Sequence, residues 1–432
     1  MAKVFVYDEF NPEDTAMMQA LYSRSPKSVE EHVEKVRQSG SGKFMSTFYV
    51  GYGHASIADC GSTTIFIEGL SILADKAVQD WPLYSGQETS TRYIDMASQA
   101  IIDPLATAES KAIIDAWMDF YIKGRERITP FLKEKYPRRD EEDEKMYDKA
   151  ISARSFDIMR GFLPAGITTQ LSWHTNLRQA WDKLSLLRHH PLQEMRELAE
   201  QILAELRSRY ENSFSHQQYP EQEAYREEMM AKYSYFAPKD PKEFSFSTDI
   251  DRNELKNFQE ALDKRPIKTN LPYFMADLGN CRFEFLLDYG SYRDIQRHRS
   301  AIARTPLLTT QLGFQSWYLE QLPEEMRLDA ENLIASQKTK VDALEASPEL
   351  KQYYIAMGFN VFCHITNPLT SAIYVTELRS GKTVHPSLRR VAHKMYEALR
   401  QNLPEVALHC DLDLDDWDVR RGLHDIVLKE QR

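Results

Sequence analysis

The strongest chemical signal in the sequence is a run of basic side chains between residues 293 and 304. Arg297, His298 and Arg299 are consecutive, and Arg293 and Arg304 flank them. Such closely spaced guanidinium and imidazole groups repel one another unless an anion lies among them, and the planar guanidinium suits a phosphate or a carboxylate. The run predicts an anion site, with a solvated basic helix end as the alternative.

A second cluster combines several kinds of polar side chain between residues 87 and 93. Gln87, Glu88, Ser90 and Arg92 bring together an amide, a carboxylate, a hydroxyl and a guanidinium. These groups could bind a polar heterocycle and its phosphate. A polar loop without a ligand would have the same composition.

A third group precedes an expected strand. His54, Ser56 and Asp59 offer an imidazole, a hydroxyl and a carboxylate. Ser56 is also a typical turn or cap residue, which is the alternative for this position.

A fourth group lies on an expected helix behind Asn176. Arg178 and Arg188 are separated by about three helical turns, so both can lie on one face of that helix. Solvent-facing ion pairs are the alternative for these helical arginines.

These side chains must be positioned by a chain that combines strands and helices. Residues 63–70 are rich in β-branched and aromatic side chains and predict a strand, after which a helix can begin at Ser71. Each half of the chain has a long helical stretch and ends in helical sequence. The long stretches are 108–133 and 324–346, and the terminal ones are 176–208 and 387–402. Mixed α and β structure is expected in both halves.

Direct comparison of the two halves indicates an internal repeat. Phe66 and Phe283 are 217 positions apart, and so are Gln79 and Gln296. A second block follows in the same order: Asn176 to Arg188 matches Asn367 to Arg379, and His190-Pro191 then matches His385-Pro386. Residues 210–270 between the halves are polar and charged, so they are expected to form a connector and not a core element.

Composition narrows the class of protein. The 432 residues allow roughly two to four domains, and 42% hydrophobic residues can fill real cores. The net charge of −11 disfavours sequence-independent binding of nucleic acid. The chain has no apolar run long enough for a membrane helix and no signal peptide pattern, so we expect a cytoplasmic protein. Four widely separated cysteines predict neither disulfides nor a cysteine-ligated metal.

Taken in order, the motifs resemble those of the flavin-dependent thymidylate synthases. The first half carries G-H-x-S-x-x-D at 53–59, Q-E-x-S-x-R-Y at 87–93 and M-R-x-x-L-P at 159–164, followed by N-x-R and L-R. The family signature is R-H-R followed after seven residues by S-x-R, and R-H-R stands at 297–299. The resemblance covers about residues 20–210 and, more weakly, 272–400.

The two halves lose complementary parts of this signature. Asp80-Trp81-Pro82 stand at the R-H-R position of the first half, whereas Arg304, Pro306 and Leu308 stand where the second half should carry Glu, Ser and Arg. Members of the family are homotetramers whose active sites lie between subunits. The resemblance therefore implies two fused subunits that pair with a second chain, giving a homodimer with two composite sites.

The resemblance also implies roles for the candidate residues, and it implies no metal. Catalysis would involve Arg297, Arg178 and Ser90, although Ser90 has no base in its motif that would make it a nucleophile. A uracil nucleotide would be bound by Gln87, Glu88, Ser90, Arg92, Arg160, Arg188 and Arg297. FAD would be held by His54, Ser56, Asp59, Asn176, Arg178, Arg297, His298 and Arg299.

The implied reaction transfers a methylene from 5,10-methylenetetrahydrofolate to C5 of dUMP or a related uracil nucleotide, with hydride from reduced FAD and with NADPH restoring the flavin. The alternatives are a non-catalytic or diverged nucleotide- or flavin-binding paralogue and, as a third class, an RNA-binding protein that uses residues 293–304. The expected fold is α+β: two tandem family domains at 1–215 and 271–432, joined by a connector at 216–270, each with a mixed sheet flanked by long helices.

Overall fold

The computed structural model describes residues 10–22, 28–51, 55–91 and 94–413, which form two compact units. Unit 1 is drawn from Met1–Glu68, Leu83–Glu88 and Gln170–Ser234, and unit 2 from Gly69–Pro82, Thr89–Thr169 and Tyr235–Arg432. The units follow packing and not the two predicted halves, because residues 89–169 of the first half belong to unit 2.

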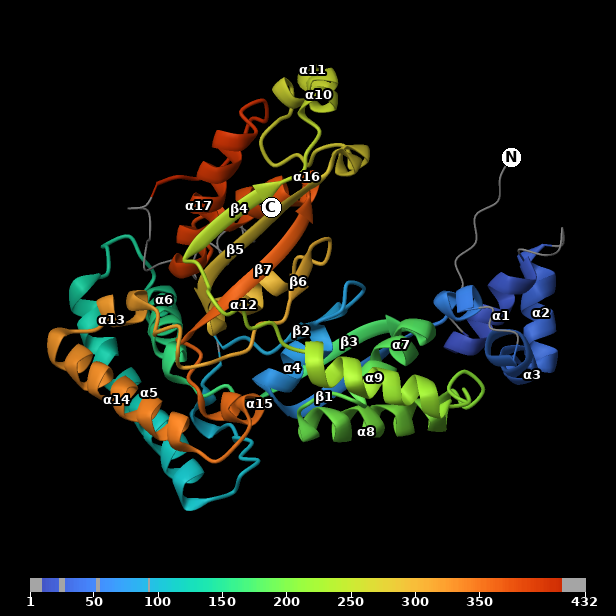
Figure 1. Cartoon of the computed structure of the whole chain (residues 1–432), viewed down its shortest axis with the longest axis horizontal. Coiled ribbons are helices and arrows are strands. Elements are labelled where there is room, and N and C mark those ends of the chain that lie inside the picture. Colours follow the sequence, from blue (N-terminus) through green and yellow to red (C-terminus); the bar gives the residue numbers. More distant parts are fainter. Residues whose placement is uncertain (1–9, 23–27, 52–54, 92–93, 414–432) are drawn as a thin grey trace. The chain divides into compact units, whose positions relative to one another are not determined.

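Unit 1 is built on a three-stranded sheet in the order β1-β3-β2 (Figure 1). Strand β2 (Ser85–Glu88) pairs antiparallel with β3 (Thr168–Asn176), and β1 (Ser62–Ser71) is the other neighbour of β3. The helices of this unit are α1 (Pro12–Tyr22), α2 (Val29–Ser39), α3 (Gly42–Phe44), α7 (Leu177–Leu187), α8 (Gln193–Arg209) and α9 (Pro220–Tyr233). Its buried residues include Trp173, Leu184 and Leu203.

Unit 2 contains a four-stranded sheet in the order β4-β5-β7-β6 (Figure 1). The strands are β4 (Phe244–Thr248), β5 (Asn280–Asp288), β6 (Ile302–Arg304) and β7 (Asn360–Pro368). All three pairings are antiparallel, so the sheet is not mixed as predicted.

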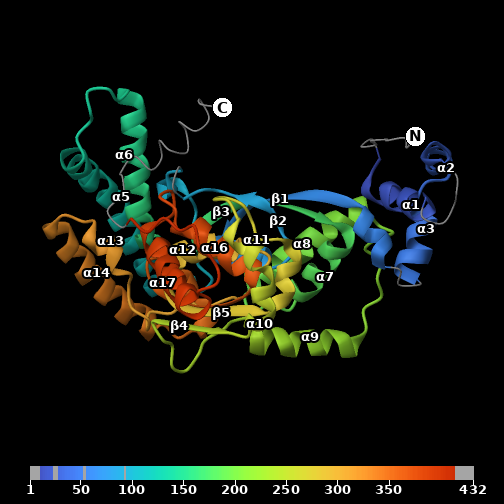
Figure 2. The ribbon, with the colours of Figure 1, turned by 90° about the horizontal axis from the view of Figure 1, so that it is seen from above.

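The helices of unit 2 form two groups, one that packs against this sheet and one whose helices pack with each other. Helices α12, α16 and α17 pack against the sheet, and α5 packs with α6 and α14 (Figure 2). The bounds are α4 (Ile72–Gln79), α5 (Ala108–Lys135), α6 (Glu144–Met159), α10 (Arg252–Leu255), α11 (Gln259–Asp263), α12 (Tyr289–Gln296), α13 (Ser316–Glu320), α14 (Glu324–Ala343), α15 (Pro348–Lys351), α16 (Leu369–Ser380) and α17 (Pro386–Asn402). None of the helices in the described ranges is long and apolar enough to cross a membrane.

The predicted elements are confirmed. The expected strand at 63–70 is β1, and the helix expected from Ser71 is α4, whose first turn is capped because Ser71 Oγ accepts a hydrogen bond from Ala74 N at 3.0 Å. Helices α5, α14 and α17 match the stretches 108–133, 324–346 and 387–402. The stretch 176–208 forms two helices, α7 and α8, which are separated around His190-Pro191.

The connector contains an element of the second sheet, which corrects the expectation of no core element there. Strand β4 pairs with β5, and the rings of Phe246 and Phe283 lie 5.0 Å apart. The polar average of the segment concealed this strand, because its two phenylalanines alternate with serines and none of its five residues is fully buried.

The two halves share strand order and register, as an internal repeat predicts. The order β1-β3-β2 of the first sheet corresponds to β5-β7-β6 in the second. Ser85 pairs with His174, and the residues 217 and 192 positions later, Ile302 and Thr366, also pair. Helices α4 and α12 are both eight residues long, end in Gln79 and Gln296, and begin after the capping residues Ser71 and Asp288.

Some predicted matches are wrong by one position. Strand β1 is one residue longer than β5, and Gly69 within it has a φ of +76°, which a glycine adopts freely. One extra residue moves every earlier side chain to the other face of a strand. Phe66, 77% exposed, therefore corresponds to Glu284 and not to Phe283, which is 1% exposed.

Two further matches shift in the same way. Strands β3 and β7 end at Asn176 and Pro368, so Asn176 corresponds to Pro368, and Arg379 corresponds to Leu187. The register of β6 on β7 likewise moves the second-half counterparts of Glu88, Ser90 and Arg92 to Thr305, Leu307 and Thr309. With this shift too, the second half has no Glu, Ser and Arg at the positions of the S-x-R segment.

Equivalent turns of the two halves pair with each other inside unit 2. Pro164 forms an antiparallel bridge with Ala356, its own counterpart. The hydrogen bonds around this bridge occur in exchanged pairs: Ala165 N to Ile355 O (2.9 Å) with Met357 N to Leu163 O (2.9 Å), and Gly166 N to Tyr353 O (3.0 Å) with Gly358 N to Gly161 O (2.7 Å). Exchanged contacts of this kind are those of a twofold interface between two like subunits.

Candidate functional site

Helix α12 positions the candidate site in unit 2, because the R-H-R sequence begins at its carboxyl end. Strand β5 leads into the helix through Asp288, whose carboxylate accepts a hydrogen bond from Ser291 N at 2.8 Å. Arg297 is the C-cap residue of α12. The carbonyl end of a helix favours positive charge, which reduces the cost of gathering arginines there.

The three R-H-R side chains have different environments. Arg297 and Arg299 are exposed, whereas His298 is buried. Nε of Arg379, on α16, donates a hydrogen bond to Nε2 of His298 at 2.8 Å, which leaves Nδ1 to carry the proton of the neutral ring. Burial, together with the Arg379 guanidinium, lowers the pKa of His298 to about 3. The positive charge of the motif therefore comes from its arginines.

The segment that carries Ser90 lies against α12. Arg293 donates from Nη1 to Thr91 Oγ1 at 3.2 Å and from Nη2 to the carbonyl oxygen of Thr89 at 3.4 Å. Arg293 lies one helical turn before Arg297, so both belong to the same side of α12. A motif fragment of the first half and the R-H-R of the second half are thereby neighbours within unit 2.

Arg160 reaches the same helix from the short 3₁₀ turn that follows α6. Its side chain is buried, with Nη2 donating to Ser291 Oγ at 3.2 Å and Nη1 lying 3.9 Å from the Asp157 carboxylate. Burial acts to lower the pKa of Arg160, but Tyr318, Asp157 and Asp288 outweigh it and raise that pKa. Arg160 therefore stays charged, and its Nε has no hydrogen-bond acceptor among the described residues.

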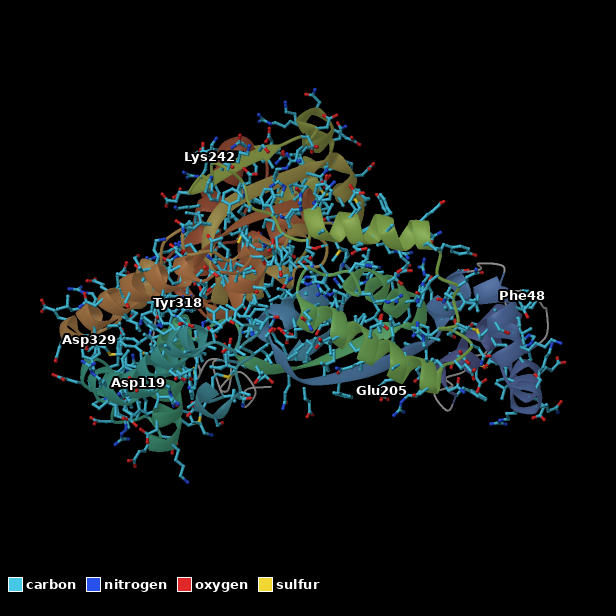
Figure 3. The ribbon with its side chains drawn as sticks, turned by 60° about the horizontal axis from the view of Figure 1, so that its bottom comes forward. Phe48, Asp119, Glu205, Lys242, Tyr318 and Asp329 are labelled. Carbon is cyan, nitrogen blue, oxygen red and sulfur yellow. The ribbon has the colours of Figure 1, made fainter. Side chains whose placement is uncertain are left out.

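A buried network of hydrogen bonds holds Arg160 and the first turn of α12 in place. Asp288 accepts hydrogen bonds from the hydroxyl of Tyr318 (2.8 Å; labelled in Figure 3) and from Oγ of Ser387. Ser291 Oγ lies 3.1 Å from Nδ1 of His385. Sequence reasoning missed Asp288, Ser291, Tyr318 and Ser387, because they lie far apart in the chain and belong to no motif, and it matched His385 only as a repeat position. Arg379 was matched only as a repeat position.

Unit 1 holds a second set of candidates, several of which bond to one another. Arg178 forms a two-point ion pair with Asp59, with distances of 2.7 Å from Nε and 2.6 Å from Nη2 to the carboxylate. Asn176 caps helix α7 by accepting a hydrogen bond from Gln179 N at 2.8 Å. These contacts give each of the three residues a structural role that does not need a ligand.

The remaining candidates of unit 1 lie on β2, at the C-cap of α7 and on a 3₁₀ turn. Arg188 is ion-paired with Glu200 and lies 3.7 Å from the Glu223 carboxylate. Gln87 and Glu88 are in β2, where Gln87 N donates to Ser172 Oγ at 3.1 Å, and Ser56 is exposed at the 3₁₀ turn before β1. His54 and Arg92 lie outside the described residues.

Two cavities lie apart from these groups. In unit 1, a cavity of about 560 Å³ lies between β1 and α8, and in unit 2 one of about 690 Å³ lies between α5 and α14. Neither cavity is lined by a candidate residue. Among the described residues, no group of three or more His, Cys, Asp or Glu side chains could hold a metal ion.

Comparison with known proteins identifies the class of protein. Residues 6–210 match the sequence model of the family described as thymidylate synthase complementing protein. This match agrees with the resemblance that the motifs of the first half carry.

Longer relatives extend the similarity into the second half. The chain is 25% identical over 403 residues to a UPF0159 protein of Chlamydia pneumoniae, covering 79% of this chain and 75% of that one. It is 23% identical over 477 residues to a UPF0159 protein of Thermoplasma acidophilum, covering 91% and 94%. Among solved structures, the flavin-dependent thymidylate synthase ThyX of Helicobacter pylori, complexed with FAD and dUMP, is 17% identical, with a TM-score of 0.29; the match covers 47% of this chain and 94% of ThyX.

Proposed function

We propose that the chain is a flavin-dependent thymidylate synthase-like methyltransferase. It would transfer a methylene from 5,10-methylenetetrahydrofolate to C5 of dUMP or a related uracil nucleotide. When bound, reduced FAD would supply the hydride, and NADPH would restore the reduced cofactor. The family match of residues 6–210 supports the reaction class.

The observation that carries the proposal is the convergence on α12. Thr89 and Thr91 flank Ser90, and both accept hydrogen bonds from Arg293. Arg160 binds the same helix through Ser291. Parts of the signature that are more than a hundred residues apart in sequence therefore meet along α12, the helix that ends at R-H-R.

The donors at this point suit FAD and a nucleotide. Arg297 and Arg299 are exposed guanidinium groups, which bind phosphates through two parallel hydrogen bonds. Positive charge near a flavin ring also stabilises the negative charge of its reduced form. The protein's share of the chemistry is to bind, orient and neutralise, since the hydride comes from the cofactor.

We further propose that the two halves are tandem copies of the family domain, 1–215 and 271–432, and that two chains form a homodimer. The shared strand order, the shared register and the exchanged hydrogen bonds at Pro164 and Ala356 support the duplication. After a duplication, each motif is needed only once per site, which accounts for the complementary losses.

Product formation tests the proposed reaction. The purified chain is supplied with FAD, dUMP, 5,10-methylenetetrahydrofolate and NADPH, and dTMP is measured by chromatography. We expect dTMP from the wild type and at least tenfold less from Arg297→Ala. A chain that takes up FAD and dUMP but forms no dTMP would exclude the methyltransferase.

A non-catalytic nucleotide-binding protein is the second candidate function. Arg178 is engaged by Asp59, and Arg188 by Glu200, so two residues expected to bind FAD or nucleotide already have acidic partners. This candidate predicts nucleotide binding by calorimetry without any methylated product.

A further inference from the structure

The correspondence between the two halves defines a second position in unit 2, the counterpart of the site at α12. Asp80, at the end of α4, stands at the position of Arg297, and Lys76 stands at that of Arg293. The 3₁₀ turns that begin at Arg160 and Gln352 correspond as well. By the same register, Thr305, Pro306, Leu307 and Leu308 correspond to Glu88, Thr89, Ser90 and Thr91.

In this counterpart, polar groups form hydrogen bonds with other groups of the same chain, so these bonds are not open to a ligand. The hydroxyl of Thr305 donates to the Asp80 carboxylate. Leu308 N donates to Oε1 of Gln352 at 3.0 Å, and both of these residues are buried. Where Arg160 presents a charged group to α12, the counterpart therefore has a neutral amide that is already bonded to the backbone.

In the counterpart, the cation at the position of Arg293 already lies against a carboxylate. The ammonium of Lys76 lies 3.3 Å from the carboxylate of Asp75, and both side chains are almost fully buried. Asp80-Trp81-Pro82 replaces the R-H-R sequence. A phosphate there would meet carboxylates, whereas at α12 it would meet the exposed Arg297 and Arg299.

A segment of the connector, around Phe236, covers the backbone that follows β6 in this counterpart. Phe236 forms a parallel bridge with Pro306: Phe236 N donates to Thr305 O at 2.8 Å, and Leu307 N donates to Phe236 O at 3.1 Å. The Phe236 ring lies 5.0 Å from the Arg304 guanidinium and 5.1 Å from the His364 ring. The backbone that follows β6 is thus paired and capped by an aromatic side chain.

We propose that each chain holds one anion site, assembled in cis from α12, Thr89–Thr91 and Arg160, and that the counterpart beside α4 is closed by the chain itself. This inference rests on the proposed function, because it concerns the phosphate-bearing ligands of the same site. It differs from the arrangement that the resemblance implies, in which active sites lie between separate subunits.

Stoichiometry gives the first test. Calorimetric titration of the FAD-loaded full chain with dUMP should give one site per chain. Two sites per chain would overturn the closed counterpart. A wild-type chain that binds neither FAD nor dUMP would instead refute the proposed function, so the two failures are distinguishable.

Complementation between chains gives the second test. Arg297→Ala and Ser90→Ala chains carrying different tags are co-expressed, and the mixed dimers are isolated through both tags. If the site is built in cis, no site in these dimers is intact, and dUMP binding stays at least tenfold weaker than in the wild type. Recovery of one wild-type site per dimer would show assembly between chains and overturn the proposal.

The matched control pairs a wild-type chain with the double variant Arg297→Ala/Ser90→Ala. Assembly in cis predicts one wild-type site per mixed dimer here, and assembly between chains predicts none. If the protein is isolated as a monomer, one dUMP bound per monomer supports the cis site, and binding that appears only on dimerisation contradicts it.

Discussion

Arg297 is the residue on which the proposed site most depends. It is exposed at the C-cap of α12, one turn beyond the Arg293 contact with Thr91. Loss of one guanidinium contact to a bound phosphate costs about 1.5–3 kcal/mol, or roughly 10–100-fold in affinity.

Arg297→Ala should therefore weaken dUMP or FAD binding about 10–100-fold, as measured by calorimetry or by retained flavin absorbance. Arg304→Ala is the matched control, because Arg304 is equally exposed and belongs to the same basic run, but stacks on Phe236. Equal losses in the two variants would contradict a specific role for Arg297.

His298 predicts a pH dependence of stability. Its pKa in the folded chain, about 3, lies below the value near 6.5 of an unfolded chain, so folding favours the neutral ring. The associated stability is present above pH 6.5 and is lost as the pH falls toward 3. The buried His190, whose pKa is also about 3 because of burial, contributes in the same direction.

Replacing His298 with a residue that does not titrate should reduce this dependence. His298→Gln keeps an acceptor for Arg379, and the loss of unfolding free energy between pH 7 and pH 5 should be about 2 kcal/mol smaller than in the wild type. Urea unfolding at the two pH values measures it. An unchanged pH dependence would mean that His298 is not buried in its neutral form.

At the scale of elements, the start of α12 joins the R-H-R helix to the rest of unit 2. Asp288 accepts hydrogen bonds from Ser291 N, the Tyr318 hydroxyl and the Ser387 hydroxyl. Its counterpart Ser71 caps α4 through Ala74 N. Asp288 therefore caps a helix and also accepts hydrogen bonds from two buried hydroxyls, whereas Ser71 at the same position of the first half caps a helix.

Asp288→Ala should destabilise the protein by about 3 kcal/mol or more, because it leaves several buried donors without an acceptor. Ser71→Ala should cost only about 1 kcal/mol, the usual value for a lost cap. Urea unfolding of both variants measures the difference. Similar losses would indicate that the Asp288 network adds nothing beyond capping.

The elements also show how far the sequence could predict the structure. Strand β1 and helices α4, α5, α14 and α17 were predictable, because their periodicity and caps are local. Strand β4 was not, since its partner β5 lies some thirty residues away and an edge strand needs little apolar sequence. The shift at Gly69 was also hidden, because one inserted residue leaves the composition unchanged.

At the site, the local motifs were visible but their partners were not. The R-H-R sequence could be found from three letters, whereas the Arg293 contact with Thr91 joins residues about two hundred positions apart. The bonds from Arg178 to Asp59 and from Arg379 to His298 also depend on packing. A single sequence contains no signal for such long-range pairs.

At the scale of the whole molecule, ligand binding should raise stability by mass action. A ligand that binds only the folded chain adds about 2.7 kcal/mol to the free energy of unfolding at a concentration of 100 times Kd. FAD with dUMP should produce this gain in the wild type at saturating concentration, as measured by urea unfolding. Arg297→Ala should show much less at the same concentrations, and an equal gain would place the ligands elsewhere.

The most direct measurement is a crystal structure of the chain with FAD and dUMP bound. The account predicts that Arg297 and Ser90 of the same chain lie within hydrogen-bond distance, about 3 Å, of ligands in one pocket. Ligands bound more than about 20 Å from either residue, or contacted by Arg297 of one chain and Ser90 of another, would contradict it.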